Sequence, residues 1–398
     1  MGKWLFFTIL FIFPCFVFAA APETGVDTLD PRNRGYLTSF CAYHPASPIC
    51  IIKVNPPVRP RPTEPEPVIL IPGGPLPILC PMPTACHQTV TGGTAQLQGA
   101  LDNAECGCEV IVKPSTTYGA VTYKRTCSAA KPLMVPAENA SGVKLAGLKI
   151  SGSYGIFQGF VTGGEITIDG DYNRVTRMLF TGTAHINVRE GSTFNRIDHN
   201  DFIVDRASGG HATIGFFRPR SVAQMYNTNR IDTNYFTTNT PTPSSSVEGM
   251  AIFHCMYGAQ DGYPDLSRFG SSKSIIENNL WENWGRKNVM EVKCSDNIFR
   301  NNTLVNSGRV LNRHGGRNIY QNNIFDNITT GLAIREFDNQ VINNYFNRAR
   351  LILYKGTRKY PDNQCFQARA WMPPGYQAPQ GPPAVRTVLD KNRGRSEE

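Results

Sequence analysis

The chain has 398 residues, of which 40 % are hydrophobic and 18 % are charged, and its formal net charge is +9. This composition is typical of a folded protein and excludes a wholly disordered chain. The positive charge favours an acidic partner, and in an exported protein it favours an acidic glycan over nucleic acid.

The first 21 residues have the pattern of a signal peptide. Lys3 provides the positive start, residues 5–18 are apolar, and residues 19–21 are alanines suited to cleavage. The apolar run is shorter than the roughly 20 residues of a membrane-spanning helix, and no later segment is long and apolar enough to span a bilayer. We therefore expect a secreted, extracellular protein without a membrane anchor after the signal is removed.

Residues 22–85 are rich in proline and predict a semi-rigid linker or stalk that carries a few cysteines. Ten cysteines remain once Cys15 is removed with the signal peptide, and seven of them lie before residue 130. An even number of cysteines in an exported chain indicates disulfide bonds. The sequence does not fix which cysteines are paired.

The segment that follows repeats the pattern Asn-x-(Ile/Val)-x-x-Asn-x-(Phe/Leu/Trp), with apolar and polar positions in alternation. The second Asn or its equivalent occupies these positions: Met178, Asn200, Asn234, Asn279, Asn302, Asn323 and Asn344. They lie 22, 34, 45, 23, 21 and 21 residues apart. A period in the low twenties with short alternating strands predicts a solenoid.

We predict an all-β fold, a right-handed single-stranded parallel β-helix over residues 86–366, in which the repeated Asn forms a ladder. Asn tolerates the left-handed backbone of a tight turn, and its amide can bond to the Asn of the next coil. A leucine-rich repeat, the competing solenoid, would need several Leu per repeat and a helical half, and neither is present. Residues 367–398 are expected to form a polar, Pro-rich tail.

Two intervals between repeats, of 34 and 45 residues, are longer than one coil. They predict loops around residues 203–225 and 237–270, which we expect to form the walls of a binding groove. Cys255 and Cys294 are expected on neighbouring coils, where a disulfide would make Cys294 structural.

The residues best suited to catalysis are concentrated near the middle of the repeats. The motif Lys-Ser-x-x-Asn of polysaccharide lyase family six matches Lys293-Cys-Ser-Asp-Asn297, with one slip at the Ser, and its Arg-His-Gly motif matches Arg313-His314-Gly315. The two motifs lie one coil apart. Over roughly residues 92–350 the sequence thus resembles the alginate lyases and chondroitinase-B-like enzymes of this family.

The resemblance implies that Lys293 is the base that removes the C5 proton of a uronic acid. It implies that Arg313 is the acid that protonates, or electrostatically supports, the departing O4. The C5 proton is acidic only when the adjacent carboxylate is neutralised, so cations must gather around that carboxylate. A Lys among other cations can have its pKa lowered towards neutrality and act as a base.

The spacing along the chain gives a second view of this site. Lys293, His314 and Arg335 each lie nine residues before a ladder Asn, so we expect them to form one stripe across coils about 4.8 Å apart. Arg313 is one position off this stripe. The resemblance favours Arg313 as the acid and the register favours His314; we place Arg313 first and assign His314 and Arg335 to substrate binding.

The sequence departs from the family at the calcium site. Relatives have a Glu-x-Glu pair seven and five residues before the Lys, where this chain has Arg286 and Asn288 with Lys287 between them. A cation and an amide cannot hold calcium as two carboxylates do. We expect no metal and no cofactor, with Arg286 or Lys287 in place of the metal and Asn288 beside the substrate. Glu291 shares a strand face with Lys293 and neutralises or tunes it.

Together these features predict a monomeric lyase that cuts a 1,4-linked uronate polymer by β-elimination, with alginate ahead of dermatan or chondroitin sulfate. Two alternatives stay open. A C5-epimerase would abstract the same proton without breaking the chain. A non-catalytic glycan-binding protein on a degenerate β-helix would account for the missing Glu pair.

Overall fold

The computed structural model describes residues 86–114, 117–139, 142–204, 213–216, 228–238, 250–252, 271–284, 288–312, 316–334, 338–353 and 388–395. The expected signal peptide and the linker lie outside these residues. None of the helices within the described ranges has the length and apolar character needed to cross a bilayer.

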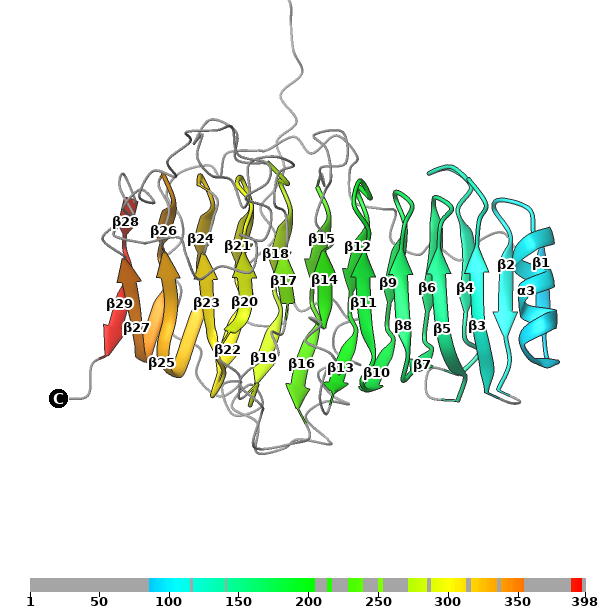
Figure 1. The fold of residues 1–398 in the computed structure, drawn as a ribbon, viewed down its shortest axis with the longest axis horizontal. Coiled ribbons are helices and arrows are strands. Elements are labelled where there is room, and N and C mark those ends of the chain that lie inside the picture. Colours follow the sequence, from blue (N-terminus) through cyan, green and yellow to red (C-terminus); the bar gives the residue numbers. More distant parts are fainter. Residues whose placement is uncertain are drawn as a thin grey trace, which may run out of the picture. The chain divides into compact units, whose positions relative to one another are not determined.

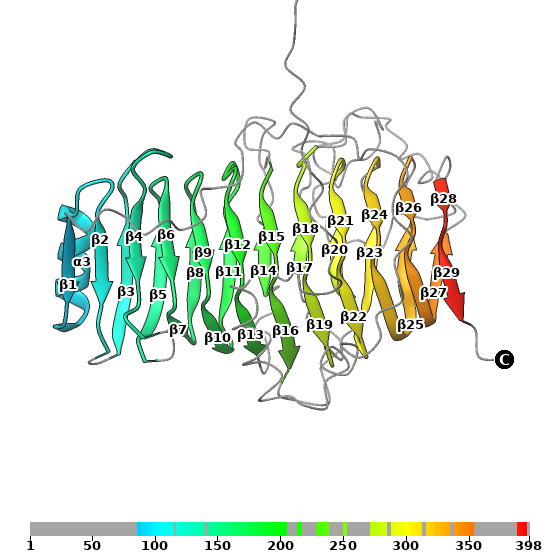
Figure 2. The ribbon, with the colours of Figure 1, turned by 180° about the vertical axis from the view of Figure 1, so that it is seen from behind.

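Parallel strands stack coil upon coil into two sheets along a common axis (Figures 1 and 2). The first sheet has twelve strands: β1 (His87–Val90), β2 (Glu109–Val112), β4 (Leu133–Pro136), β6 (Gly155–Gln158), β9 (Arg174–Thr176), β12 (Arg196–Asp198), β15 (Arg230–Asp232), β18 (Ile275–Glu277), β21 (Ile298–Arg300), β24 (Ile319–Gln321), β26 (Gln340–Ile342) and β28 (Val388–Asp390). Each coil contributes one strand, and neighbours such as Ile197 and Ile231 lie side by side. The predicted parallel β-solenoid is confirmed.

The second sheet bends around the rest of each coil. Its strands are β3 (Tyr118–Tyr123), β5 (Lys144–Ile150), β7 (Val161–Thr162), β8 (Glu165–Ile168), β10 (Leu179–Gly182), β11 (His185–Val188), β13 (Asp201–Val204), β14 (Ile214–Phe216), β16 (Tyr235–Thr238), β17 (Met250–Ile252), β19 (Leu280–Glu282), β20 (Asn288–Val292), β22 (Thr303–Val305), β23 (Arg309–Asn312), β25 (Ile324–Ile334), β27 (Tyr345–Leu353) and β29 (Arg393–Arg395). One strip of this sheet runs through β11, β14, β17, β20 and β23, and it carries Lys293 at the end of β20.

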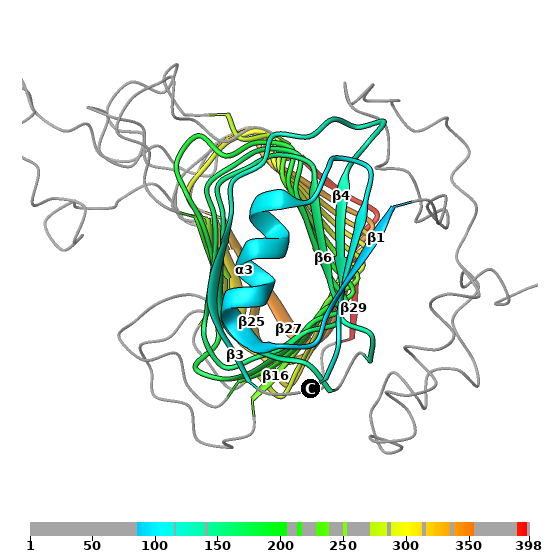
Figure 3. The same cartoon turned by 90° about the vertical axis from the view of Figure 1, so that its right-hand side faces the viewer.

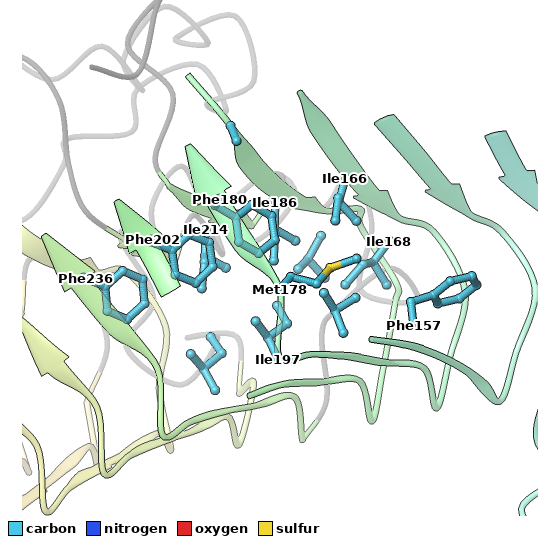
Figure 4. Close-up of a cluster of buried hydrophobic side chains, with 14 of the residues drawn as sticks. Phe157, Ile166, Ile168, Met178, Phe180, Ile186, Ile197, Phe202, Ile214 and Phe236 are labelled. Atoms are coloured by element: carbon cyan, nitrogen blue, oxygen red, sulfur yellow. The ribbon is translucent and has the colours of Figure 1, made fainter. Parts of the chain in front are cut away.

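The apolar position of each repeat fills the interior of the coils. Phe180, Phe202, Phe236 and Trp281 lie one above another with ring centroids 4.3, 4.7 and 4.8 Å apart. Figure 4 shows the three phenylalanines of this column. This spacing is close to the separation of neighbouring strands, so equivalent positions of successive coils stack directly. The aromatic column therefore holds the coils in one register.

The predicted asparagine ladder is present and is accompanied by a second one. In the predicted ladder the backbone N–H and the Nδ2 of Asn302 both donate to Asn323 Oδ1, and the same pattern runs from Asn200 to Asn344. The first Asn of the motif forms the second ladder, in which Asn297 donates to Asn318 Oδ1. Both ladders are buried, so their amides satisfy backbone groups that turns would otherwise leave unpaired.

The left-handed residue of each turn is the one before the ladder Asn, not the ladder Asn itself. His199, Asn278, Asn301 and Asn322 all have φ between 55° and 56°. Placing the left-handed backbone one residue earlier leaves the ladder Asn with an inward side chain that reaches the next coil.

A helix closes the N-terminal end of the solenoid. α3 (Gly93–Asn103) lies across the open coil and buries Leu97, Ala100 and Leu101, which share one helix face (Figure 3). Disulfides join Cys86 to Cys108 and Cys106 to Cys127 at this end. The sequence predicted only β-structure from residue 86, so this helical cap was not expected.

The last coil comes from the segment that was expected to be a tail. β28 pairs with β26, and β29 pairs with β27. Asn392 lies between them and accepts hydrogen bonds from the N–H and the Nδ2 of Asn344. The solenoid thus extends beyond the expected boundary at residue 366.

Candidate active site

Lys293 lies directly after β20 on the outer face of the second sheet. Met290 and Val292 are in the core, and alternation along the strand directs Glu291 and Lys293 outward. Both charged side chains are nonetheless buried, with relative exposures of 2 % for Glu291 and 5 % for Lys293. A buried lysine is rare, and at an outward position it indicates a built site rather than a solvated surface.

The nearest acid to the Lys293 ammonium on the same strand is Glu291. The Lys293 Nζ and Glu291 Oε1 atoms are 3.8 Å apart, which is an ion pair rather than a tight hydrogen bond. Burial disfavours the charged ammonium, and the neighbouring carboxylate favours it. The two influences oppose each other at the atom that is predicted to take a proton.

Asn288 begins β20 and faces an arginine of the next coil. Arg309, the first residue of β23, donates from Nε to Asn288 Oδ1 at 2.8 Å. Arg309 is partly buried, and alternation with the core residue Val310 directs it to the same outer face. The sequence predicted Asn288 as a site residue but did not indicate Arg309.

The register between β20 and β23 contains an irregularity. Asn288 pairs with Arg309, but Met290 pairs with Val310, so Val289 is an extra residue in β20. From there Val292 pairs with Asn312, and Asn312 pairs with Ile334. The positions that follow these three in the chain are 293, 313 and 335.

The lengths of the turns after β20, β23 and β25 explain why counting residues from a ladder Asn placed His314, and not Arg313, in line with Lys293. Val292 and Ile334 each lie five residues before their ladder Asn, at 297 and 339, whereas Asn312 lies six residues before Asn318. One additional residue in that turn shifts the count by one. Distance from a ladder Asn therefore does not give the strand register in this coil.

Asn312 is a polar residue in an otherwise apolar inward column. Its equivalents on neighbouring coils are Val292 and Ile334, and it is fully buried. Asn312 Nδ2 donates to the hydroxyl of Tyr320 at 3.0 Å and to Asn339 Oδ1 at 3.1 Å. These bonds tie the end of β23 to the first sheet and to a ladder. An Asn among Ile and Val is a signal in the sequence, but it belongs to neither family motif.

Several predicted site residues lie outside the described residues: Arg286, Lys287, Arg313, His314 and Arg335. The same holds for Cys255 and for nearly all of the two expected groove loops. Of the predicted set, the structure describes Lys293, Asn288 and Glu291, and it brings all three to the outer face of β20 and its C-terminal end.

The described residues do not fit the calcium site that the family resemblance implies. Asn288 Oδ1 accepts a hydrogen bond from a guanidinium, which occupies the neighbourhood in which a cation would sit. Calcium prefers six to eight oxygen ligands with several carboxylates among them. Among the described residues, no three Asp, Glu, His or Cys side chains are gathered in a way that could hold a metal ion.

Comparisons with solved structures show where this fold is known. A PL6 family polysaccharide lyase from Pseudopedobacter saltans is 18 % identical, with a TM-score of 0.58 and 79 % of each chain covered. The PL6 family alginate lyase AlyGC is 20 % identical with a TM-score of 0.52, over 70 % of this chain but 41 % of AlyGC. A mannuronic acid specific family 6 lyase from human gut microbiota is 19 % identical, with a TM-score of 0.52 and 78 % of each chain covered. At these identities the likeness is one of fold alone.

A comparison of sequences assigns the family. No curated protein sequence matches the chain. The family profile of Chondroitinase B matches residues 92–359, which is well over half of the chain and includes nearly all of the described solenoid. The chain belongs to the chondroitinase B family of polysaccharide lyases.

Proposed function

We propose that the protein cleaves a 1,4-linked uronate polymer, alginate before dermatan or chondroitin sulfate, by β-elimination with Lys293 as base and Arg313 as acid. The observation that carries the proposal is Lys293 itself, a buried lysine on the outer face of the solenoid with a carboxylate 3.8 Å away. A lysine amine in its neutral form is a competent base for the C5 proton.

The register of the neighbouring residues supports Arg313 over His314 as the partner of Lys293. Val292, Asn312 and Ile334 lie side by side on three coils. The next residues in the chain are Lys293, Arg313 and Arg335, so a continued register gives three cations about 4.8 Å apart. Cations at this spacing are suited to one uronate carboxylate and the atoms beside it.

The reaction proceeds by breaking two bonds at neighbouring carbons. The Lys293 amine takes the C5 proton, and the electron pair of the C5–H bond forms the C4=C5 double bond. The C4–O4 electron pair leaves with O4, which takes a proton from the Arg313 guanidinium. The products are two fragments, one of which carries a 4,5-unsaturated uronate at its new end, and solvent restores both residues.

We further propose that the protein acts outside the cell. The two disulfides at the N-terminal end, Cys86–Cys108 and Cys106–Cys127, support this location because disulfides persist in oxidising compartments.

The test is to mix the full chain with alginate, its mannuronate and guluronate fractions, dermatan sulfate and pectate. The expected result is a rise in ultraviolet absorbance from the unsaturated product on at least one polymer. No rise on any of them would exclude a lyase. A changed C5 configuration in the NMR spectrum of an uncut polymer would instead identify an epimerase, and binding without turnover would identify a glycan-binding protein.

A further inference from the structure

Arg309 has a different partner from four other arginines of the solenoid. Arg174, Arg196, Arg300 and Arg317 each hydrogen-bond a carboxylate on a neighbouring coil. Arg309 donates to the neutral amide of Asn288 at 2.8 Å, and none of the described carboxylates forms an ion pair with it. A partly buried guanidinium without a carboxylate is costly in free energy unless an anion binds there.

The position of Arg309 relates this cation to the candidate base. Arg309 faces outward from the same strip of sheet as Lys293. It is the first residue of β23, and Arg313 follows the last residue of that strand in the chain. About four residues of strand, or about 13 Å, separate its position from that of Lys293. Two long side chains that converge over the sheet can reach one sugar or two adjacent sugars across that distance.

Asn288 fixes the direction of this guanidinium. Asn288 is 7 % exposed, and its Oδ1 accepts a hydrogen bond from Arg309 Nε, which leaves the two terminal nitrogens of Arg309 for a ligand. Those nitrogens form the planar fork that matches a carboxylate with two parallel hydrogen bonds. Val289, the extra residue in β20, sets Asn288 opposite Arg309.

We propose that Arg309 binds a carboxylate of the polyuronate substrate, with Asn288 as its positioning residue, and supplies the positive charge that calcium supplies in relatives. This rests on the proposed function, and it names a substrate-binding residue absent from the motif-based site. The Asn288–Arg309 pair does not fit calcium, which supports a protein cation in that role.

The test measures binding separately from turnover. Lys293→Met removes the base, so a mannuronate or guluronate hexasaccharide stays intact and its Kd can be measured by calorimetry. Adding Arg309→Gln to this background is expected to weaken binding by at least 10-fold, and Arg309→Lys by less, since it keeps the charge but loses the fork. Arg348→Gln is the charge-matched control, because Arg348 pairs with Asp326 on the exposed surface.

A methyl-esterified hexasaccharide identifies the group that is bound. It carries no carboxylate charge, so Arg309→Gln should change its Kd by less than twofold. Equal Kd values for the charged hexasaccharide with and without Arg309→Gln would overturn the inference. Failure of the wild-type protein to cut any polymer would remove the proposed function but leave this binding measurement decisive for Arg309.

Discussion

Lys293 combines properties that rarely occur together in a lysine: it faces outward from its strand, it is buried, and it has a carboxylate nearby. Glu291 is the described partner, 3.8 Å from Nζ. The family motif was sufficient to find Lys293 and Asn288 in the sequence. Arg309 was not predicted as a site residue because it belongs to no family motif. Only the strand register places it opposite Asn288.

Replacing Lys293 by Met should remove the proton acceptor while keeping most of the buried volume. We expect the rate of unsaturated-product formation to fall by about 10²- to 10⁴-fold, the usual contribution of a general base. Lys149→Met is the control, because Lys149 is on the same sheet but pairs with Asp169 in solvent. Retention of the wild-type rate in Lys293→Met would exclude Lys293 as the base.

At the scale of single elements, the strand β23 links the core to the candidate site. Asn312 ends the strand inside the solenoid, bonded to Tyr320 and Asn339, and Arg313 is the next residue. Burial of the Tyr320 phenol raises its pKa well above the ordinary value, so it stays a neutral partner at any working pH. The Asn312 cluster thus fixes the point at which the chain leaves the sheet.

Tyr320→Phe deletes the hydroxyl from this cluster and nothing else. We expect a loss of about 1 kcal/mol in the free energy of unfolding, and a lower kcat because the end of β23 is less well fixed. Tyr123→Phe removes a similar buried hydrogen bond, to Ser153 O at 2.9 Å, far from Lys293. It should show the loss of stability with an unchanged kcat; an equal loss of kcat in both variants would contradict a positioning role.

One substitution in the buried Asn ladder and one in an exposed column of Asn can be compared for their effect on stability. Asn302 bonds Asn323 and Ile276 O in the interior, whereas Asn306 bonds Asn283 on the surface. Asn302→Ala leaves several buried groups unpaired and should cost about 2 kcal/mol or more. Asn306→Ala should cost less than about 0.5 kcal/mol. Denaturant unfolding of the two variants measures the difference, and similar values would mean that the ladder contributes little.

The sequence predicted the repeats well because each part of the motif corresponds to a structural feature of one coil. These features are an inward apolar residue, a left-handed turn and a ladder Asn. The prediction failed where one residue changes the register, at Val289 in β20 and in the turn after Asn312. Neither irregularity alters the motif, so no pattern marks it. The last coil was missed because Asn392 follows a long stretch without repeats and its motif lacks the final aromatic residue.

For the molecule as a whole, ion pairs on the outer face of the first sheet connect successive coils. Arg174 bonds Asp198, and Arg196 bonds Asp232 one coil further along. Burial alone would raise the pKa of Asp198, but the hydrogen bonds from Arg174 and His199 and the charge of Arg196 hold it well below its ordinary value. The folded state is therefore stabilised by the ionised form.

This coupling predicts an acid-sensitive solenoid. An Asp with a depressed folded pKa contributes its full stability above its unfolded pKa, about 3.9, and loses that stability as the pH falls towards the folded value. Thermal unfolding from pH 6 down to pH 2 should show this fall in the wild-type protein. Asp198→Asn should be less stable at pH 6 and should fall less steeply below pH 4. Parallel profiles for the two proteins would show that Asp198 does not carry the effect.

The final coil makes the C-terminus of this chain a poor place for a tag or a deletion. β28 and β29 return after residues 354–387, and Asn392 supplies the last oxygen for the Asn344 amide. A chain stopped at residue 387 would expose the edges of both sheets at once, and bare parallel edges recruit other chains. Shortened versions of this enzyme would then be lost to aggregation, although every residue of the candidate active site is still present.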